Sequence, residues 1–158
     1  NSVGGVVEVR AIGVPAGLGE PVFDKLQAQL ALGLMSIGTI RGFEIGLGFK
    51  SAEMTGKEVN DEMGFEKGKF VFKTNNAGGV QGGISNGEDI IVRIASHAPS
   101  SILMEQKTVN EKGKKVDLKV EGRHDPCLCP RIVPVAEAMV ALVLVDNLLI
   151  QNSRKGFD

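Results

Sequence analysis

The chain has 158 residues, of which 42% are hydrophobic, and its formal net charge is -1. This length and apolar content suffice for one substantial core, so we expect a single domain covering residues 1–158. The near-neutral charge gives no basic surface of the kind that binds nucleic acid or an acidic membrane. Charge alone therefore indicates no macromolecular partner.

The sequence begins with Asn1 rather than Met, and strand-like sequence starts at Gly4. We therefore expect no signal peptide and interpret the chain as a piece of a longer protein. The two cysteines, Cys127 and Cys129, are too close in sequence for a disulfide that closes a useful loop. A reducing, cytoplasmic compartment is expected.

The first 50 residues predict a strand, a helix and a second strand. Residues 4–13 alternate imperfectly between apolar and charged side chains, which is typical of a strand with one buried face. After a turn at 15–19, a helical stripe of apolar side chains ends near Gly38. This stripe consists of Phe23, Leu26, Leu30 and Leu34. Residues 40–49 predict a strand interrupted by glycines.

The middle of the chain is predicted to be rich in strands. Residues 50–73 are charged and lack sustained periodicity, which indicates a long surface excursion. Residues 89–96 predict a strand, and residues 101–109 and 114–120 flank the turn-forming stretch 110–113 as in a hairpin. The chain is therefore expected to hold about five strands.

The last predicted element is a helix from about Val133 to Asn152 that is apolar nearly all round. Such a helix is long enough to cross a bilayer, but Glu137 and Asp146 would each be costly there. A helix packed between or upon sheets is favoured, and no membrane is expected. The order of elements predicts an α+β fold with two long helices.

A glycine-rich segment, residues 75–87, contains five glycines and three asparagines directly before a predicted strand. Glycines let backbone N–H groups converge on an anion and let a ligand approach closely. The same composition also suits a connector built from turns. The segment lacks the Gly-Lys-Ser/Thr ending of a P-loop and the strand-first context of a dinucleotide fingerprint.

Residues 122–127 bring a cation, an imidazole and a carboxylate together in Arg123, His124 and Asp125. Arginine suits phosphate oxygens, and the neighbouring Asp and His could move protons. The alternative is a salt-bridged turn between a strand and a helix. A zinc site at His124, Cys127 and Cys129 would lack a fourth ligand, and no metal is expected. Residues 97–101, His-Ala-Pro-Ser-Ser, place an imidazole and two hydroxyls between two strands.

Several motifs together resemble the chorismate synthase family. They are the Gly-Val-Pro-Ala-Gly-Leu-Gly-Glu-Pro-Val-Phe run at 13–23, the Asn-Ala-Gly-Gly-x-x-Gly-Gly-Ile-Ser run at 76–85, and Gly-Arg-His-Asp-Pro-Cys at 122–127, continuing to Pro134-x-x-Glu137-Ala138-Met139. Because the motifs occur in order over nearly the whole chain, the chain is identified as the C-terminal portion of a member of this family. The family fold implied is a layered β-α-β sandwich, of which this chain would form roughly half.

The resemblance implies a carbon-oxygen lyase of the shikimate pathway, which leads to aromatic amino acids. This flavoprotein converts 5-enolpyruvylshikimate 3-phosphate to chorismate and phosphate by a 1,4-anti elimination. It requires reduced FMN without net redox change, is associated with NADPH, and forms a cytoplasmic homotetramer. Asp125 is implied to handle a proton. The implied cofactor-binding residues are Gly38, Thr39, Gly82, His97, Ala98, Pro99, Ser100, Ser101 and Arg123.

The chain departs from the family pattern at two places. His97 stands where the family has Lys, and Gly38-Thr39 stand where it commonly has Asn-Ala. An imidazole loses its charge near neutral pH, so phosphate binding is expected to weaken as pH rises. The family's Gly-Glu-Ser-His-Gly motif, its arginine-rich loop and its Gly-Gly-Arg-Ser segment are not in this sequence, so this piece alone is expected to have no turnover.

Two further functions stay open at this point. The chain could be a non-catalytic assembly module in which glycines merely permit close packing, or a degenerate paralogue that binds another phosphorylated ligand. The enzyme hypothesis makes a geometric prediction of its own. It expects the Arg123–Asp125 turn and the Gly78–Gly83 loop to come together, within one chain or in the assembled oligomer, as one wall of a single anionic-cofactor cleft.

Overall fold

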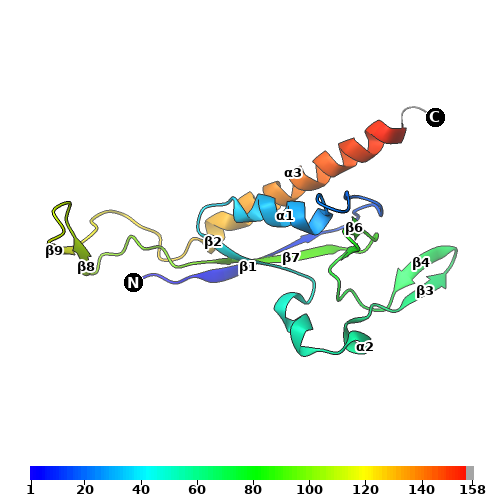
Figure 1. The fold of residues 1–158 in the computed structure, drawn as a ribbon, viewed down its shortest axis with the longest axis horizontal. Helices are drawn as coiled ribbons and strands as arrows, with labels where there is room; N and C mark the ends of the chain where they lie inside the picture. The colour runs from blue at the N-terminus through cyan, green and yellow to red at the C-terminus, as the bar shows by residue number, and fades with distance from the viewer. Residues whose placement is uncertain (156–158) are drawn as a thin grey trace.

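The structure is a computed structural model that describes residues 1–155 and has the predicted α+β class. Its central feature is an antiparallel sheet of three strands in the order β1-β7-β2. The strands are β1 (Gly5–Ala11), β2 (Ile40–Ile45) and β7 (Ile90–Ser96). Two helices, α1 (Leu26–Met35) and α3 (Cys129–Lys155), lie on the same side of this sheet (Figure 1). The central unit is therefore one three-stranded sheet covered on one face by a layer of two helices.

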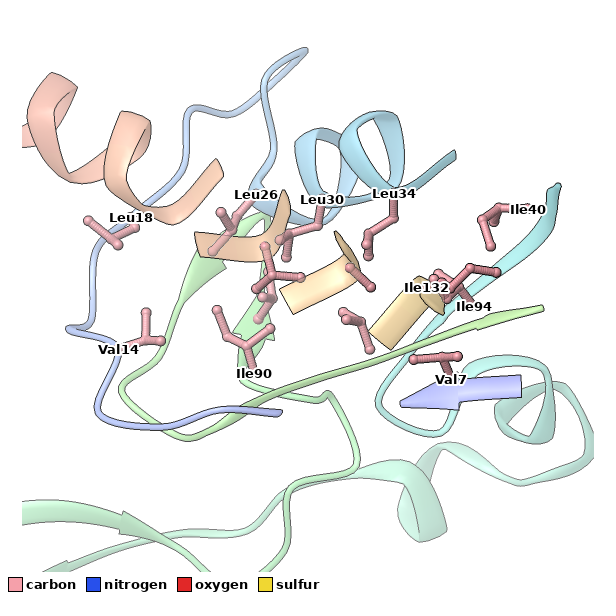
Figure 2. Close-up of a cluster of buried hydrophobic side chains, with 14 residues drawn as sticks. Val7, Val14, Leu18, Leu26, Leu30, Leu34, Ile40, Ile90, Ile94 and Ile132 are labelled. Carbon is pink, nitrogen blue, oxygen red and sulfur yellow. The ribbon is translucent and has the colours of Figure 1, made fainter. Parts of the chain in front are cut away.

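The core lies between the sheet and the helices because each element has an apolar face of the right period. In α1, the side chains of Leu26, Leu30 and Leu34 are four residues apart and fully buried. In β7, burial alternates as a strand requires, with its inward-facing apolar residues packed against those helices (Figure 2). Burying one such leucine contributes about 2–3 kcal/mol, so this layer organises the fold.

The outer face of the helical layer is apolar and exposed. On α1, Leu32 is 74% exposed. On α3, the exposed apolar side chains are Val133, Val135, Leu142, Val145, Leu148 and Leu149. The sequence predicted that α3 would be buried nearly all round, whereas in this chain it buries one face, against β1 and α1. By length and apolar composition alone, α3 could cross a membrane. The core helix of a soluble protein meets the same two criteria, so this is weak evidence for a membrane span.

The described residues contain nine strands rather than the five that the sequence predicted. Four short ones were missed. Within the surface excursion, β3 (Met63–Glu66) and β4 (Lys69–Phe72) form a hairpin after the 3-10 helix η1 (Gly48–Glu53) and the short helix α2 (Gly56–Val59). The other two, β5 (Val80–Gln81) and β6 (Ile84–Ser85), are pairs of residues inside the glycine-rich segment.

The predicted hairpin near residue 110 is confirmed as β8 (Gln106–Val109) and β9 (Lys115–Leu118). Asn110 closes its turn, because its side-chain Oδ1 accepts hydrogen bonds from the backbone N–H groups of Lys112 and Lys114. The hairpin projects from one extreme of the molecule, while β3 and β4 project from the other (Figure 1).

Candidate functional site

A polar pocket opens where β7 ends and α3 begins. We call residues 97–101 and 122–131 the basic end. The pocket encloses about 600 Å³. Its lining residues are Pro99, Ser101, Arg123, His124, Asp125, Leu128 and Arg131. Two stretches that are separated by the β8–β9 hairpin in the sequence therefore share one cavity.

The start of β2 fixes the first stretch of the basic end. The backbone N–H of His97 donates to the carbonyl oxygen of Thr39 at 3.0 Å, and the hydroxyls of Thr39 and Ser96 are 2.9 Å apart. Thr39 has a positive φ of 76°, which costs a residue with a side chain about 1–3 kcal/mol. The surrounding hydrogen bonds hold Thr39 in this conformation, beside the residue that follows β7.

The N-terminal segment joins the two stretches of the basic end. The Ser2 hydroxyl donates to the Pro99 carbonyl oxygen at 2.6 Å, and the backbone N–H of Val3 donates to the Pro126 carbonyl oxygen at 2.8 Å. Gly4 passes so close that a Cβ there would lie 2.4 Å from the carbonyl oxygen of Ser96. The backbone around the pocket is thus connected through residues 2–4.

The charged groups of the basic end are one ion pair and one further guanidinium, that of Arg123. Asp125 is paired with Arg131, with Nε 2.6 Å from Oδ2 and Nη2 3.2 Å from Oδ1. Within residues 1–155, neither Arg123 nor His124 forms an ion pair. The salt-bridged turn considered from the sequence is therefore present, and it leaves the guanidinium of Arg123 available to an anion.

The glycine-rich segment, residues 75–87, which we call the glycine end, is packed against its own neighbours. A Cβ on Gly78 would lie 2.4 Å from the backbone nitrogen of Gly46, and one on Gly79 would lie 2.6 Å from the carbonyl oxygen of Asp89. Both glycines have positive φ. At Gly82, by contrast, a Cβ would meet nothing within 4 Å. Most of this segment therefore serves close backbone packing.

A buried carboxylate anchors the glycine end. Asp61 is 8% exposed and accepts hydrogen bonds from the Thr74 hydroxyl at 2.6 Å and the backbone N–H groups of Asn76 and Ala77 at 2.7 and 2.8 Å. Burial opposes ionisation of Asp61, but the three hydrogen bonds together outweigh it and lower its pKa. Asp61 thus ties the surface excursion to the glycine end as an anion.

The two ends do not form one wall within this chain. The glycine end precedes β7 and the basic end follows it, so the seven residues of β7 separate them by about 20 Å. Figure 1 shows β6 and the β8–β9 hairpin at opposite ends of the sheet. The prediction of a single wall is therefore wrong for one chain, because one strand connects the two segments end to end.

Most of the predicted site residues gather at the basic end. Pro99, Ser101, Arg123 and Asp125 line its pocket. Thr39 contacts Ser96 and His97, and Gly38 lies next to it in the sequence, whereas Gly82 lies at the glycine end. The Nδ1 atom of His97 is 2.7 Å from the Ala98 carbonyl oxygen.

Sequence reasoning missed Arg131, because the predicted helix began at Val133. The structure begins α3 at Cys129, with Pro134 inside the helix. Arg131 therefore belongs to the first turn, and its position two residues before the predicted helix and six after Asp125 was the available signal. In the described part of the chain, both cysteines are free thiols and no cluster of three metal-ligating side chains occurs.

Comparisons with known proteins give one consistent result. A family model described as Chorismate synthase matches residues 1–149. A chorismate synthase of Archaeoglobus fulgidus is 57% identical over 153 residues, which cover 96% of this chain and 42% of that protein. One of Cyanothece sp. is 57% identical over 149 residues, covering 94% of this chain and 41% of that protein.

A solved structure titled Crystal Structure of Chorismate Synthase has a TM-score of 0.77 and 36% sequence identity. The match covers 95% of this chain and 38% of that one. This chain thus spans less than half the length of the relatives that it matches.

Proposed function

The chain belongs to the chorismate synthase family, and from this premise we propose that it is the C-terminal portion of an enzyme that makes chorismate. The substrate is 5-enolpyruvylshikimate 3-phosphate, and the reaction is a 1,4-anti elimination. The substrate loses a proton from carbon and its C–O bond to phosphate breaks, so a new double bond forms without net redox change. Residues 1–158 form a single domain that contributes part of the site.

The basic end supports this proposal because its donors fit a phosphate monoester. Arg123 offers a forked guanidinium, and Ser101, which carries a hydroxyl, lines the same cavity. We assign FMN binding to residues 97–101, Arg123, Gly38 and Thr39, and proton handling to Asp125. When bound there, reduced FMN would supply a transient electron. Asp125 would hold or move a proton at a carboxylate oxygen.

Gly82 is included as a flavin-lining residue on the strength of the family resemblance. Since it lies at the glycine end, its role requires either that the flavin extend along the sheet or that a neighbouring subunit bring Gly82 to the basic end. A cytoplasmic homotetramer, as the family implies, provides such neighbours. Gly82 has open space above its Cα, which suits a group that must approach the backbone closely.

The exposed apolar face of α1 and α3 supports the layered β-α-β sandwich. A face with Leu32 at 74% and Leu149 at 61% exposed is unusual for a soluble domain by itself. We propose that a second sheet, from the part of the protein outside this chain, covers it. A non-catalytic assembly module would present the same apolar face. This alternative function is favoured if the full-length protein binds no flavin.

The proposal is tested in the full-length protein by titrating reduced FMN and measuring chorismate formation. Arg123→Ala should raise the Kd for FMN roughly 10–100-fold, because a hydrogen bond to a charged group contributes about 1.5–3 kcal/mol. Arg154→Ala is the matched control, since it removes an arginine that pairs with Glu20 at the far end of α3. Absence of chorismate formation by the wild type would refute the enzyme proposal.

Unchanged flavin affinity in Arg123→Ala would refute the assigned role of the basic end. Binding of another phosphorylated compound in place of FMN would favour the degenerate paralogue. The present chain alone should show no turnover, because the family's histidine and arginine motifs are not in it. Chorismate formation by the purified 158-residue chain would overturn this expectation.

A further inference from the structure

Arg131 holds the carboxylate of Asp125 on both oxygens. Its Nε lies 2.6 Å from Oδ2 and its Nη2 donates to Oδ1 at 3.2 Å, which is the forked geometry that only arginine provides. The backbone of Arg131 is fixed by α3, where its N–H donates to the Leu128 carbonyl oxygen at 3.0 Å, while its side chain is 75% exposed. The pair forms part of the pocket wall at the basic end.

The backbone of Asp125 is restrained independently of this pair. Pro126 confines the preceding residue to an extended conformation. The Pro126 carbonyl oxygen accepts a hydrogen bond from the Val3 N–H at 2.8 Å, which ties the turn to the N-terminal segment. With the backbone held by Pro126 and Val3, the rotamer of the Asp125 side chain is the remaining freedom, and the ion pair with Arg131 restricts it.

The two arginines of the pocket therefore differ in what they can do. Within the described residues Arg123 has no carboxylate partner, whereas Arg131 uses two of its nitrogens on Asp125. We propose that Arg131 is a positioning residue that acts through Asp125, fixing the orientation of its carboxylate toward the pocket, while Arg123 serves the anion directly. This inference rests on the proposed function, because it refines the role of Asp125 within it.

The kinetic test is a double-mutant cycle in the full-length protein. Asp125→Ala should lower kcat by 10²-fold or more, as loss of a proton-handling group does. Arg131→Ala should lower kcat roughly 10–100-fold with KM and FMN affinity nearly unchanged, since misorientation of a reacting group is costly. The double variant should be no slower than Asp125→Ala alone.

Arg131→Lys keeps the charge but loses the fork, so it should recover only part of kcat. Arg10→Ala is the matched control, because Arg10 forms an ion pair with Asp89 at 2.6 Å at the opposite end of β7. The kcat of the Arg10→Ala variant should equal that of the wild type. Additive losses in the cycle, or an Arg131→Ala variant that loses FMN affinity instead of kcat, would overturn the proposal.

A second measurement does not depend on activity. In a crystal structure of the full-length Arg131→Ala variant, the Asp125 side chain should occupy more than one rotamer or a different one, while the backbone at Pro126 stays in place. An unchanged single rotamer would show that Arg131 does not position Asp125. If the wild type makes no chorismate, the proposed function fails, but this measurement still decides the positioning role.

Discussion

The two ends of β7 use polar and glycine-rich sequence in opposite ways. At the glycine end, Gly46 and Gly78 bring two backbones into contact, and Asp61 is buried as their anchor. At the basic end, Arg123 and His124 are exposed and line a cavity. Substitutions at the glycine end should therefore change the free energy of unfolding, and those at the basic end should change binding or turnover.

The largest expected effect is that of Gly46→Ala on stability. Gly46 has a φ of 56°, and a Cβ there would lie 2.1 Å from the carbonyl oxygen of Asn76. Left-handed strain of about 1–2 kcal/mol adds to an overpacking cost of about 1–3 kcal/mol, so we expect a loss of roughly 3 kcal/mol. Urea unfolding of the full-length protein measures it.

Gly113→Ala is the matched control for this comparison. Gly113 has a φ of 72° in the β8–β9 turn, and a Cβ there would meet nothing within 4 Å. The Gly113→Ala variant should lose only the part of the unfolding free energy that comes from left-handed strain, about 1–2 kcal/mol. If Gly46→Ala and Gly113→Ala lose the same free energy of unfolding, the close contact between Gly46 and the glycine end contributes nothing to stability.

Asp61→Asn should cost about 1–3 kcal/mol at pH 7, because the buried anion that accepts three hydrogen bonds is replaced by a weaker acceptor. Since the pKa of Asp61 is lowered by folding, its stabilisation is present above the unfolded value of about 4 and is lost as pH falls through the folded pKa. The difference in unfolding free energy between Asp61→Asn and wild type should therefore shrink from pH 6 to pH 3. A constant difference would contradict this account.

Gly82→Ala tests whether the glycine end also takes part in binding. Its φ of 60° and open surroundings predict a stability loss of about 1–2 kcal/mol. If Gly82 lines the flavin as proposed, the added methyl group should also raise the Kd for reduced FMN roughly tenfold. An unchanged Kd would confine flavin binding to the basic end.

The smallest expected effect is that of His97→Lys on affinity. His97 is exposed, and its ring nitrogen Nδ1 lies against the Ala98 carbonyl oxygen. A lysine brings a fixed positive charge to a position where the family has one, so FMN affinity should rise about threefold to fivefold at pH 8. An unchanged affinity in His97→Lys would show that a charge at this position does not reach the phosphate.

Periodicity was sufficient to predict the elements that form the core. Leu26, Leu30 and Leu34 of the predicted stripe and the alternation in β7 specify burial directly, because packing follows the period of each element. The prediction that Phe23 begins the same stripe was wrong, because Phe23 precedes α1 and is 91% exposed. The strands β3 and β4 were missed because their stability comes from pairing and from the edge-to-face contact of Phe65 with Phe70. Such short strands have too few residues to show a period.

For the site, the motifs identified the right residue types but not their partners. The sequence indicated Arg123 and Asp125 as site residues. Only the structure shows that the first turn of α3 places Arg131 where it pairs with Asp125. The separation of the two ends was in principle readable, because the strand predicted at 89–96 lies between them. Composition alone suggested a ligand role for glycines that the structure uses mainly for packing.

The uncovered side of the helical layer bears on how the protein reaches its native state. Until the proposed covering sheet docks, residues such as Leu142 and Leu149 are exposed to solvent on a nascent α3. An intermediate with this much apolar surface is prone to aggregate, so assembly of the layers must compete with self-association. Yield on refolding should therefore fall as protein concentration rises.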